Sequence, residues 1–141
     1  MHKKSLAILH NKKSGNNFQV AKIIQKKMIC ACFAAEDNPN IEEFDPIIIV
    51  ASNMGDEEIS QPMEDYLFAI KDRNKQYFVC ELGNYFGLED YCGCKKIIHQ
   101  ILDKLNWNKL SDISLDSFPE LDVEKLETWI KNALLDDGKR K

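Results

Sequence analysis

The feature that most constrains this chain is the unbroken run of apolar, mostly branched residues at positions 46–51, Pro-Ile-Ile-Ile-Val-Ala. A strand with one face in water alternates apolar and polar residues, whereas a parallel strand covered on both faces is apolar throughout. The run therefore predicts a central strand of a parallel sheet. Because parallel strands are joined by crossover segments, usually helices, the rest of the chain must supply helices between its strands.

The remaining sequence shows that alternation of strands and helices. Short apolar runs, each expected to form a strand, are separated by segments whose apolar residues recur every three or four positions, as on one face of a helix. Asp122 stands where it would cap the last helix. Successive strand–helix units of this kind predict an α/β fold, in which helices cover both faces of one parallel sheet. The expected strands are residues 6–9, 28–35, 46–51, 76–80 and 110–115, and the apolar helix faces fall within residues 20–28, 59–70, 94–105 and 123–134.

Length and charge limit the function classes. With 141 residues, the chain is long enough for one domain over residues 1–141 and too short for two unless both are minimal. A net charge of -4 argues against a nucleic-acid-binding protein, which needs clustered basic surface. No apolar run approaches the roughly 20 residues of a membrane span, and the first residues do not lead into a signal-peptide core. We therefore expect a cytoplasmic protein that binds neither nucleic acid nor membranes. We also expect a monomer, although none of these features bears on it.

The five cysteines do not indicate a disulfide framework, because their number is odd and a reducing compartment would keep them as thiols. Two Cys-x-Cys pairs, Cys30 with Cys32 and Cys92 with Cys94, could be metal half-sites, but neither has the spacing of a zinc site. Cys92 and Cys94 lie near an expected helix start, where the helix dipole could lower a thiol pKa. We favour the alternative, that the cysteines are small buried side chains, and expect no metal.

A candidate anion site follows the first expected strand, where residues 11–17 form a polar loop before a helix. Backbone N–H groups at a helix start point toward one spot, with the positive end of the helix dipole behind them. Gly15 permits a tight backbone turn, and the side chains of Ser14, Asn16 and Asn17 can hydrogen-bond to phosphate oxygens. The Walker pattern of nucleotide-binding loops is absent. An ordinary strand-to-helix turn capped by Asn17 is the alternative.

Two further loops should meet this one. In parallel sheets of this type, ligands bind beyond the carboxyl ends of the strands, where the winding of the chain reverses. The loops after the first, third and fourth expected strands, residues 11–17, 52–58 and 81–91, should therefore form one site. These loops are rich in Gly, Asn, Ser and acidic residues, which packing does not explain.

Three motifs in these loops resemble the FMN-contacting segments of flavodoxins. They are K-K-S-G-N-N at 12–17, F-D-P-I-I-I-V-A-S-N-M-G-D-E at 44–57 and L-G-N-Y-F-G-L-E-D-Y-C-G at 82–93, and their order and spacing match those of the family. The resemblance covers essentially the whole chain and is closest to short-chain flavodoxins, since no insertion interrupts the last strand. It implies a flavodoxin-like three-layer sandwich, with a five-stranded parallel sheet in the order 2-1-3-4-5.

The resemblance also implies which residues bind FMN. Met54 and Leu88 stand at the two positions where flavodoxins usually stack aromatic side chains on the flavin ring. Tyr85, Phe86 or Tyr91 could take the place of Leu88 there. The implied contacts are Lys12, Lys13, Ser14, Gly15, Asn16 and Asn17 around the phosphate, Ser52, Asn53, Met54 and Gly55 on one face of the ring, and Leu82, Gly83, Asn84, Tyr85, Leu88, Tyr91 and Cys92 on the other.

For function, the resemblance implies an electron carrier rather than an enzyme, with the redox chemistry supplied by FMN and no catalytic side chain. Acidic residues in the loops would disfavour the anionic reduced flavin and so give a low potential. The same residues would steer the exposed flavin edge toward basic docking surfaces on redox partner proteins. These acidic residues are Asp56, Glu57, Glu58, Glu81, Glu89 and Asp90.

Two alternatives stay open. A flavodoxin-fold domain that has lost FMN and serves as an interaction module would keep the strands and change the loops, and Leu88 favours it. An FMN-dependent quinone reductase is the other, although such enzymes usually carry loop insertions that are not evident here. A phosphoacceptor receiver domain is excluded, because Ala51 and Ser52 end the third expected strand in place of an aspartate.

Overall fold

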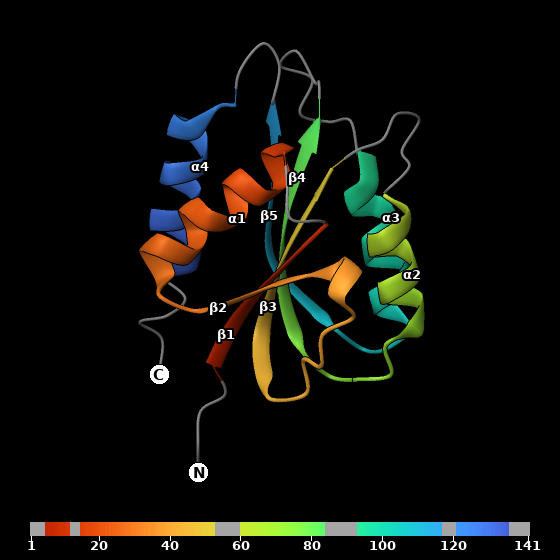
Figure 1. Cartoon of the computed structure of the whole chain (residues 1–141). Helices are drawn as coiled ribbons and strands as arrows, with labels where there is room; N and C mark the ends of the chain where they lie inside the picture. Colours follow the sequence, from red (N-terminus) through yellow and green to blue (C-terminus); the bar gives the residue numbers. More distant parts are fainter. Residues whose placement is uncertain (1–4, 12–14, 53–59, 84–92, 117–120, 136–141) are drawn as a thin grey trace.

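A five-stranded parallel sheet forms the middle layer of the fold (Figure 1) in a computed structural model that describes residues 5–11, 15–52, 60–83, 93–116 and 121–135. The strands are β1 (Ser5–His10), β2 (Ala31–Ala34), β3 (Phe44–Ser52), β4 (Gln76–Gly83) and β5 (Asn108–Asp116), and the helices are α1 (Gly15–Met28), η1 (Ala35–Asp37), α2 (Gln61–Ala69), α3 (Gly93–Asp103), α4 (Val123–Trp129) and η2 (Ile130–Leu135). The strand order is β2-β1-β3-β4-β5, and neighbouring strands are parallel. The predicted fold class and sheet order are therefore confirmed.

β3 is the central strand that the apolar run predicted. It pairs with β1 on one side and with β4 on the other. The side chains of residues 47–51 are 0% exposed, because helices cover both faces of the strand. β3 is longer than the predicted range 46–51, since Phe44 and Ser52 also pair with neighbouring strands.

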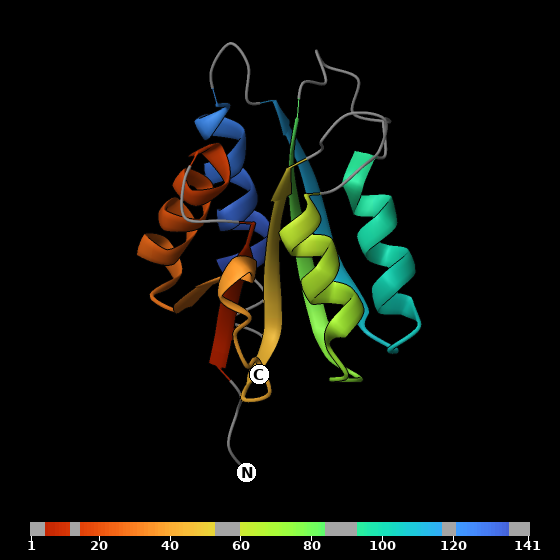
Figure 2. The ribbon, with the colours of Figure 1, turned by 45° about the vertical axis from the view of Figure 1, so that its right-hand side comes forward.

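The helices pack in two layers against opposite faces of the sheet. α2 and α3 cover one face and α1 and α4 cover the other, with the sheet between them (Figure 2). Successive residues of β3 alternate between the layers: Ile47 and Ile49 join the core under α2 and α3, and Ile48 and Val50 join the core under α1 and α4. This is the period-two geometry of a strand. None of the helices in the described ranges combines the length and the apolar content that crossing a membrane requires.

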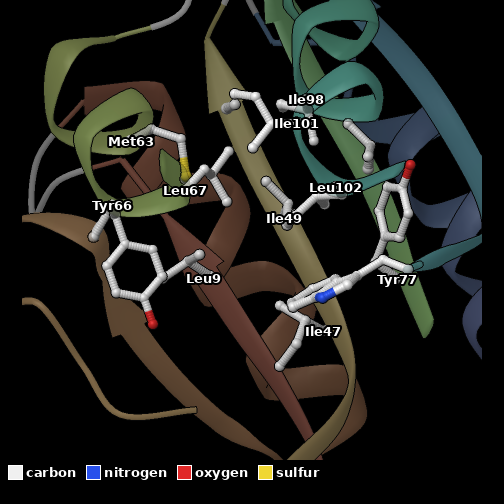
Figure 3. Close-up of a cluster of buried hydrophobic side chains, with 14 of the residues drawn as sticks. Leu9, Ile47, Ile49, Met63, Tyr66, Leu67, Tyr77, Ile98, Ile101 and Leu102 are labelled. Carbon is white, nitrogen blue, oxygen red and sulfur yellow. The ribbon is translucent and has the colours of Figure 1, made fainter. Parts of the chain in front are cut away.

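Figure 3 shows the core on the side of α2 and α3. Met63 and Leu67 of α2 lie in this cluster with Ile49 of β3. α3 contributes Ile98 and Leu102 to the same cluster. Burying a side chain of this size contributes about 1.5–3 kcal/mol to the stability of the fold. The apolar face predicted for each of these two helices is the face that packs against the sheet.

Two strand boundaries differ from the prediction. β2 spans Ala31–Ala34 rather than 28–35, because α1 continues through Met28. β4 continues to Gly83 instead of ending at Cys80, since residues 81 and 82 pair with both β3 and β5. The start of the predicted loop 81–91 is therefore part of the sheet.

The last helix confirms one expectation and corrects another. Asp122 caps it, because its Oδ1 accepts a hydrogen bond from the backbone N–H of Lys125 at 3.1 Å. Leu126 and Leu134 are buried as predicted. Val123, also predicted on the inner face, is 36% exposed, because the helix meets the core only from Leu126 onward.

α1 ends at an unusual residue. Ile29 follows the last residue of the helix with a φ of 51°, in the left-handed region where glycine is the usual residue after a helix. A hydrogen bond of 2.7 Å from its backbone N–H to the carbonyl oxygen of Gln25 closes the last turn. A β-branched side chain is strained in this conformation. The side chain of Ile29 is 89% exposed, so packing does not offset the strain.

Replacing this residue should stabilise the protein. Ile29→Gly relieves a left-handed strain of about 1–2 kcal/mol against a glycine entropy cost of about 0.5–1 kcal/mol. We expect the free energy of unfolding in urea to rise by roughly 1 kcal/mol. Asn38→Gly is the matched control, because Asn38 has the same φ of 51° but asparagine tolerates it, so the gain should be smaller. A loss of stability in Ile29→Gly would show that this turn is not kept in solution.

Candidate functional site

The carboxyl ends of β1, β3 and β4 lie next to one another at one edge of the sheet. His10 of β1 pairs with Val50 of β3, and Ser52 of β3 pairs with Leu82 of β4. The three loops were predicted to meet at this edge. The predicted site residues that the structure describes are Gly15, Asn16, Asn17, Ser52, Leu82 and Gly83. The others, Lys12, Lys13, Ser14, Asn53, Met54, Gly55, Asn84, Tyr85, Leu88, Tyr91 and Cys92, lie outside the described residues.

Gly15 begins α1 at this edge. Its φ of 76° lies in the left-handed region that favours glycine. No described atom lies within 4 Å of the place where a Cβ would stand, apart from those of its chain neighbours and of its own helix backbone. The space beside the backbone is therefore open. α1 has 14 residues and no acidic residue in its first turn, so no carboxylate of that turn competes with a ligand for the N–H groups at the helix start. A phosphate fits this arrangement.

Asn17 joins the first loop to the end of β3. It is 4% exposed. Its Oδ1 accepts a hydrogen bond from the backbone N–H of Asn11 at 3.3 Å, and its Nδ2 donates to Oγ of Ser52. The structure thus brings together Asn17 and Ser52, two predicted site residues that are 35 positions apart. The sequence placed both near the ligand but did not predict that one would bind the other.

Asn11 is a site residue that the sequence analysis did not single out. It follows β1 directly and is 4% exposed, and its Oδ1 is buried without a hydrogen-bond partner among the described residues. A buried acceptor left unpaired costs about 1–3 kcal/mol. A ligand that donates an N–H or O–H group there would recover that cost. The unpaired atom is the signal for this residue, and a sequence pattern does not reveal it.

Glu81 is not one of the loop carboxylates that could steer partner proteins, and that prediction was wrong. It is part of β4 and is 0% exposed. Its carboxylate accepts hydrogen bonds from Oγ of Ser114 at 2.7 Å and from the backbone N–H of Lys95 at 3.0 Å, and Sγ of Cys94 donates to it at 3.5 Å. The start of α3 supplies the N–H group and the positive end of a helix dipole, which stabilise the carboxylate away from water.

The favoured interpretation of the cysteines as small buried side chains is confirmed for Cys94. This residue is buried, and burial followed by the nearby carboxylate of Glu81 raises its pKa, the opposite of what the helix dipole alone could do. Cys30 and Cys32 both pack against the core under α1 and α4, and burial raises the pKa of Cys30 to about 11. Within the described ranges, His, Cys, Asp and Glu side chains form no group of three or more that could hold a metal.

Solved structures share this arrangement of strands and helices. The chain is similar to flavodoxin 2 from Bacillus cereus, with a TM-score of 0.72 and 21% sequence identity over 96% of this chain and 99% of that chain. A short-chain flavodoxin associated with a bacterial microcompartment gives a TM-score of 0.70 and 16% identity over 95% of this chain and 99% of that one. The chain has the flavodoxin fold. The resemblance seen in the loop motifs is thus confirmed at the level of the fold.

Another solved structure with the flavodoxin fold is flavodoxin from Fusobacterium nucleatum, which is bound to flavin mononucleotide. Its TM-score is 0.60, with 20% identity over 84% of this chain and 74% of that chain. The sequence matches no protein-family model and no curated protein. A functional assignment must therefore rest on the residues at the carboxyl edge of this chain's own sheet.

The bridge made by Asn17 should contribute to stability. Asn17→Ala removes the partners of the Asn11 N–H and of the Ser52 hydroxyl, so the free energy of unfolding should fall by about 1–3 kcal/mol. Urea denaturation of the ligand-free protein measures this change. Asn16→Ala is the matched control, because Asn16 is the exposed neighbour in the same helical turn, and we expect a much smaller effect. Equal losses in the two variants would show that the bridge does not stabilise the folded state.

Proposed function

We propose that this chain is an FMN-binding, low-potential electron carrier that exchanges electrons with partner proteins and has no substrate of its own. The observation that carries the proposal is the hydrogen bond from Asn17 to Ser52, which joins the start of α1 to the end of β3 in a flavodoxin fold. Gly15, in the same first turn of α1, has open space at its Cβ position. A structural neighbour with this fold is bound to FMN. In the sequence, the loop motifs of this chain follow or include the ends of β1, β3 and β4, the three strands whose carboxyl ends lie at this edge.

Each part of FMN would meet a suitable part of this edge. The start of α1 at Gly15 suits the phosphate, and Lys12 and Lys13 would add charge-assisted hydrogen bonds to it. Ser52 and Leu82, which are paired neighbours at the strand ends, would border the flavin ring. The residues that follow them in the chain would then cover its two faces.

FMN, when bound, supplies the redox chemistry, so the protein needs no catalytic side chain. The chain positions the ring and sets the charge around it. Its loop carboxylates would disfavour added negative charge on the ring and so lower the potential. They would also favour partners with basic docking surfaces, and salt should weaken that encounter. These residues are Asp56, Glu57, Glu58, Glu89 and Asp90.

Leu88 favours one other function. It stands where flavodoxins usually carry an aromatic side chain, and an aromatic stacking partner contributes about 0.5–1.5 kcal/mol beyond simple burial. A chain that no longer binds FMN could keep this fold as a protein-interaction module. The two functions differ in a property that can be measured directly, because only the electron carrier binds flavin.

Titration with FMN distinguishes them. We expect one FMN to bind each chain, with heat released in calorimetry and quenching of flavin fluorescence. Riboflavin, which lacks the phosphate, should bind more weakly because it leaves the helix start unoccupied. If saturating FMN produces neither heat nor quenching, the electron-carrier function is abandoned in favour of the interaction module.

The two lysines of the first loop test the phosphate position. Changing both Lys12 and Lys13 to Thr should weaken FMN binding roughly tenfold or more, because charge-assisted hydrogen bonds are worth about 1.5–3 kcal/mol each. The salt dependence of FMN binding should flatten, and riboflavin binding should change little. The matched control changes Lys26 and Lys27 to Thr, which removes the same charge from the last turn of α1, the helix that follows this loop in the sequence. Equal losses for FMN and riboflavin would mean that Lys12 and Lys13 act elsewhere.

A further inference from the structure

Glu81 is a buried charged residue that packing alone does not require. It lies on the same face of β4 as Tyr77 and Val79, which belong to the apolar core under α2 and α3. An apolar side chain at this position would continue that core. Burying a carboxylate costs free energy, and even a paired buried charge is weak support for stability. A role other than packing therefore has to be considered.

The hydrogen bonds of Glu81 connect the two ends of one site loop. β4 ends at Gly83 and α3 begins at Gly93, so the segment 84–92 starts and finishes at these two points. From within β4, Oε2 of Glu81 accepts a hydrogen bond of 3.0 Å from the backbone N–H of Lys95, in the first turn of α3. This contact fixes the start of α3 relative to the end of β4.

A second set of contacts holds the carboxylate in place. Its Oε1 accepts a hydrogen bond of 2.7 Å from Oγ of Ser114 on the neighbouring strand β5. Nζ of Lys95 donates to the same Ser114 oxygen at 3.1 Å and pairs with Asp112 at 3.3 Å. The Glu81 side chain is thus tied to β5 and to α3 at once, and it cannot move without breaking one of these contacts.

Glu81 is also next in the sheet to the two strand residues that were proposed to border the flavin ring. In the sheet, Glu81 pairs with Ala51, and the next pair along the strands is Leu82 with Ser52. These last two residues would border the ring. One residue along a strand corresponds to about 3.3 Å, so Glu81 lies one step below them.

We propose that Glu81 is a positioning residue for the flavin ring and that its carboxylate acts in two ways. Its reach to α3 fixes the end of β4, which would border the ring, relative to the start of α3. Its negative charge, held away from water one residue before Leu82, would disfavour the anionic reduced flavin more than the oxidised flavin. This inference rests on the proposed function.

Two conservative variants separate the effect of the length of the Glu81 side chain from the effect of its charge. Glu81→Asp keeps the charge but is one methylene shorter, so the contact with Lys95 is lost. FMN and riboflavin should then both bind roughly tenfold more weakly, because the ring position changes and the phosphate position does not. Glu81→Gln keeps the reach and loses the charge, so FMN affinity should stay within roughly threefold while the reduction potential becomes more positive. Fluorescence quenching gives the affinities, and a spectroelectrochemical titration gives the potential.

Lys75→Met is the matched control. Lys75 is also a buried charged residue, 4% exposed, but it lies next to the opposite end of β4, where its Nζ donates to the carbonyl oxygens of Glu42 and Phe44. This change should lower the urea midpoint without altering the affinity for either flavin or the potential. It therefore separates a loss of stability from a loss of ring positioning.

Each outcome decides between the parts of the proposal. Absence of flavin binding by the parent chain would overturn the proposed function itself. If the parent binds FMN, unchanged affinities in Glu81→Asp, or equal losses in Lys75→Met, would show that Glu81 does not position the ring. An unchanged potential in Glu81→Gln would overturn the electrostatic part. If Glu81→Asp fails to fold, Ser114→Ala takes its place, because it removes the contact of the Ser114 hydroxyl with Oε1, together with its contact with Nζ of Lys95, and should weaken both flavins alike.

Discussion

Burial of β3 on both faces is the constraint on which the rest of the structure depends. The residues at 47–51 can leave water on both faces only if each face carries a layer of helices. Parallel neighbours of β3 cannot be joined by short turns, so the chain must cross over the sheet between strands. The crossover segments α1, α2 and α3 are the elements that bury β3, together with α4 at the end of the chain. One strand therefore determines both the topology and the layers.

The same parallel arrangement creates the site. All strands end at the same edge, where apolar pairing stops and polar groups need partners. Asn17 connects Asn11 with Ser52 there, and Glu81 connects β5 with the start of α3. Both side chains are buried and reach across segments that are distant in sequence. The floor of the site is thus held by directional hydrogen bonds, whereas the middle of the sheet is held by apolar contacts, which are not directional.

The sequence predicted the sheet better than the contacts at its edge, and the reason is physical. The run at 46–51 permits few structures, because its side chains must all be buried. Glu81 was placed in a loop because a lone glutamate in a buried strand is unfavourable. Its compensation comes from Ser114, 33 residues away, and from a helix start, which a local pattern does not show. At Ile29 the β-branched side chain favours a strand, but the left-handed turn that closes α1 delays β2.

The burial of Glu81 also changes how strongly its charge acts on nearby groups. An exposed loop carboxylate acts through water, and salt screens it beyond about 8–10 Å. A carboxylate at 0% exposure acts through protein, where the effective dielectric is lower and the interaction at a given distance is several times stronger. Lys95 offsets part of this charge, but its ammonium group is bound to Ser114 and Asp112. In the proposed electron carrier, the buried carboxylate of Glu81 would therefore act on the ring more strongly, at a given distance, than a loop carboxylate that is in contact with water.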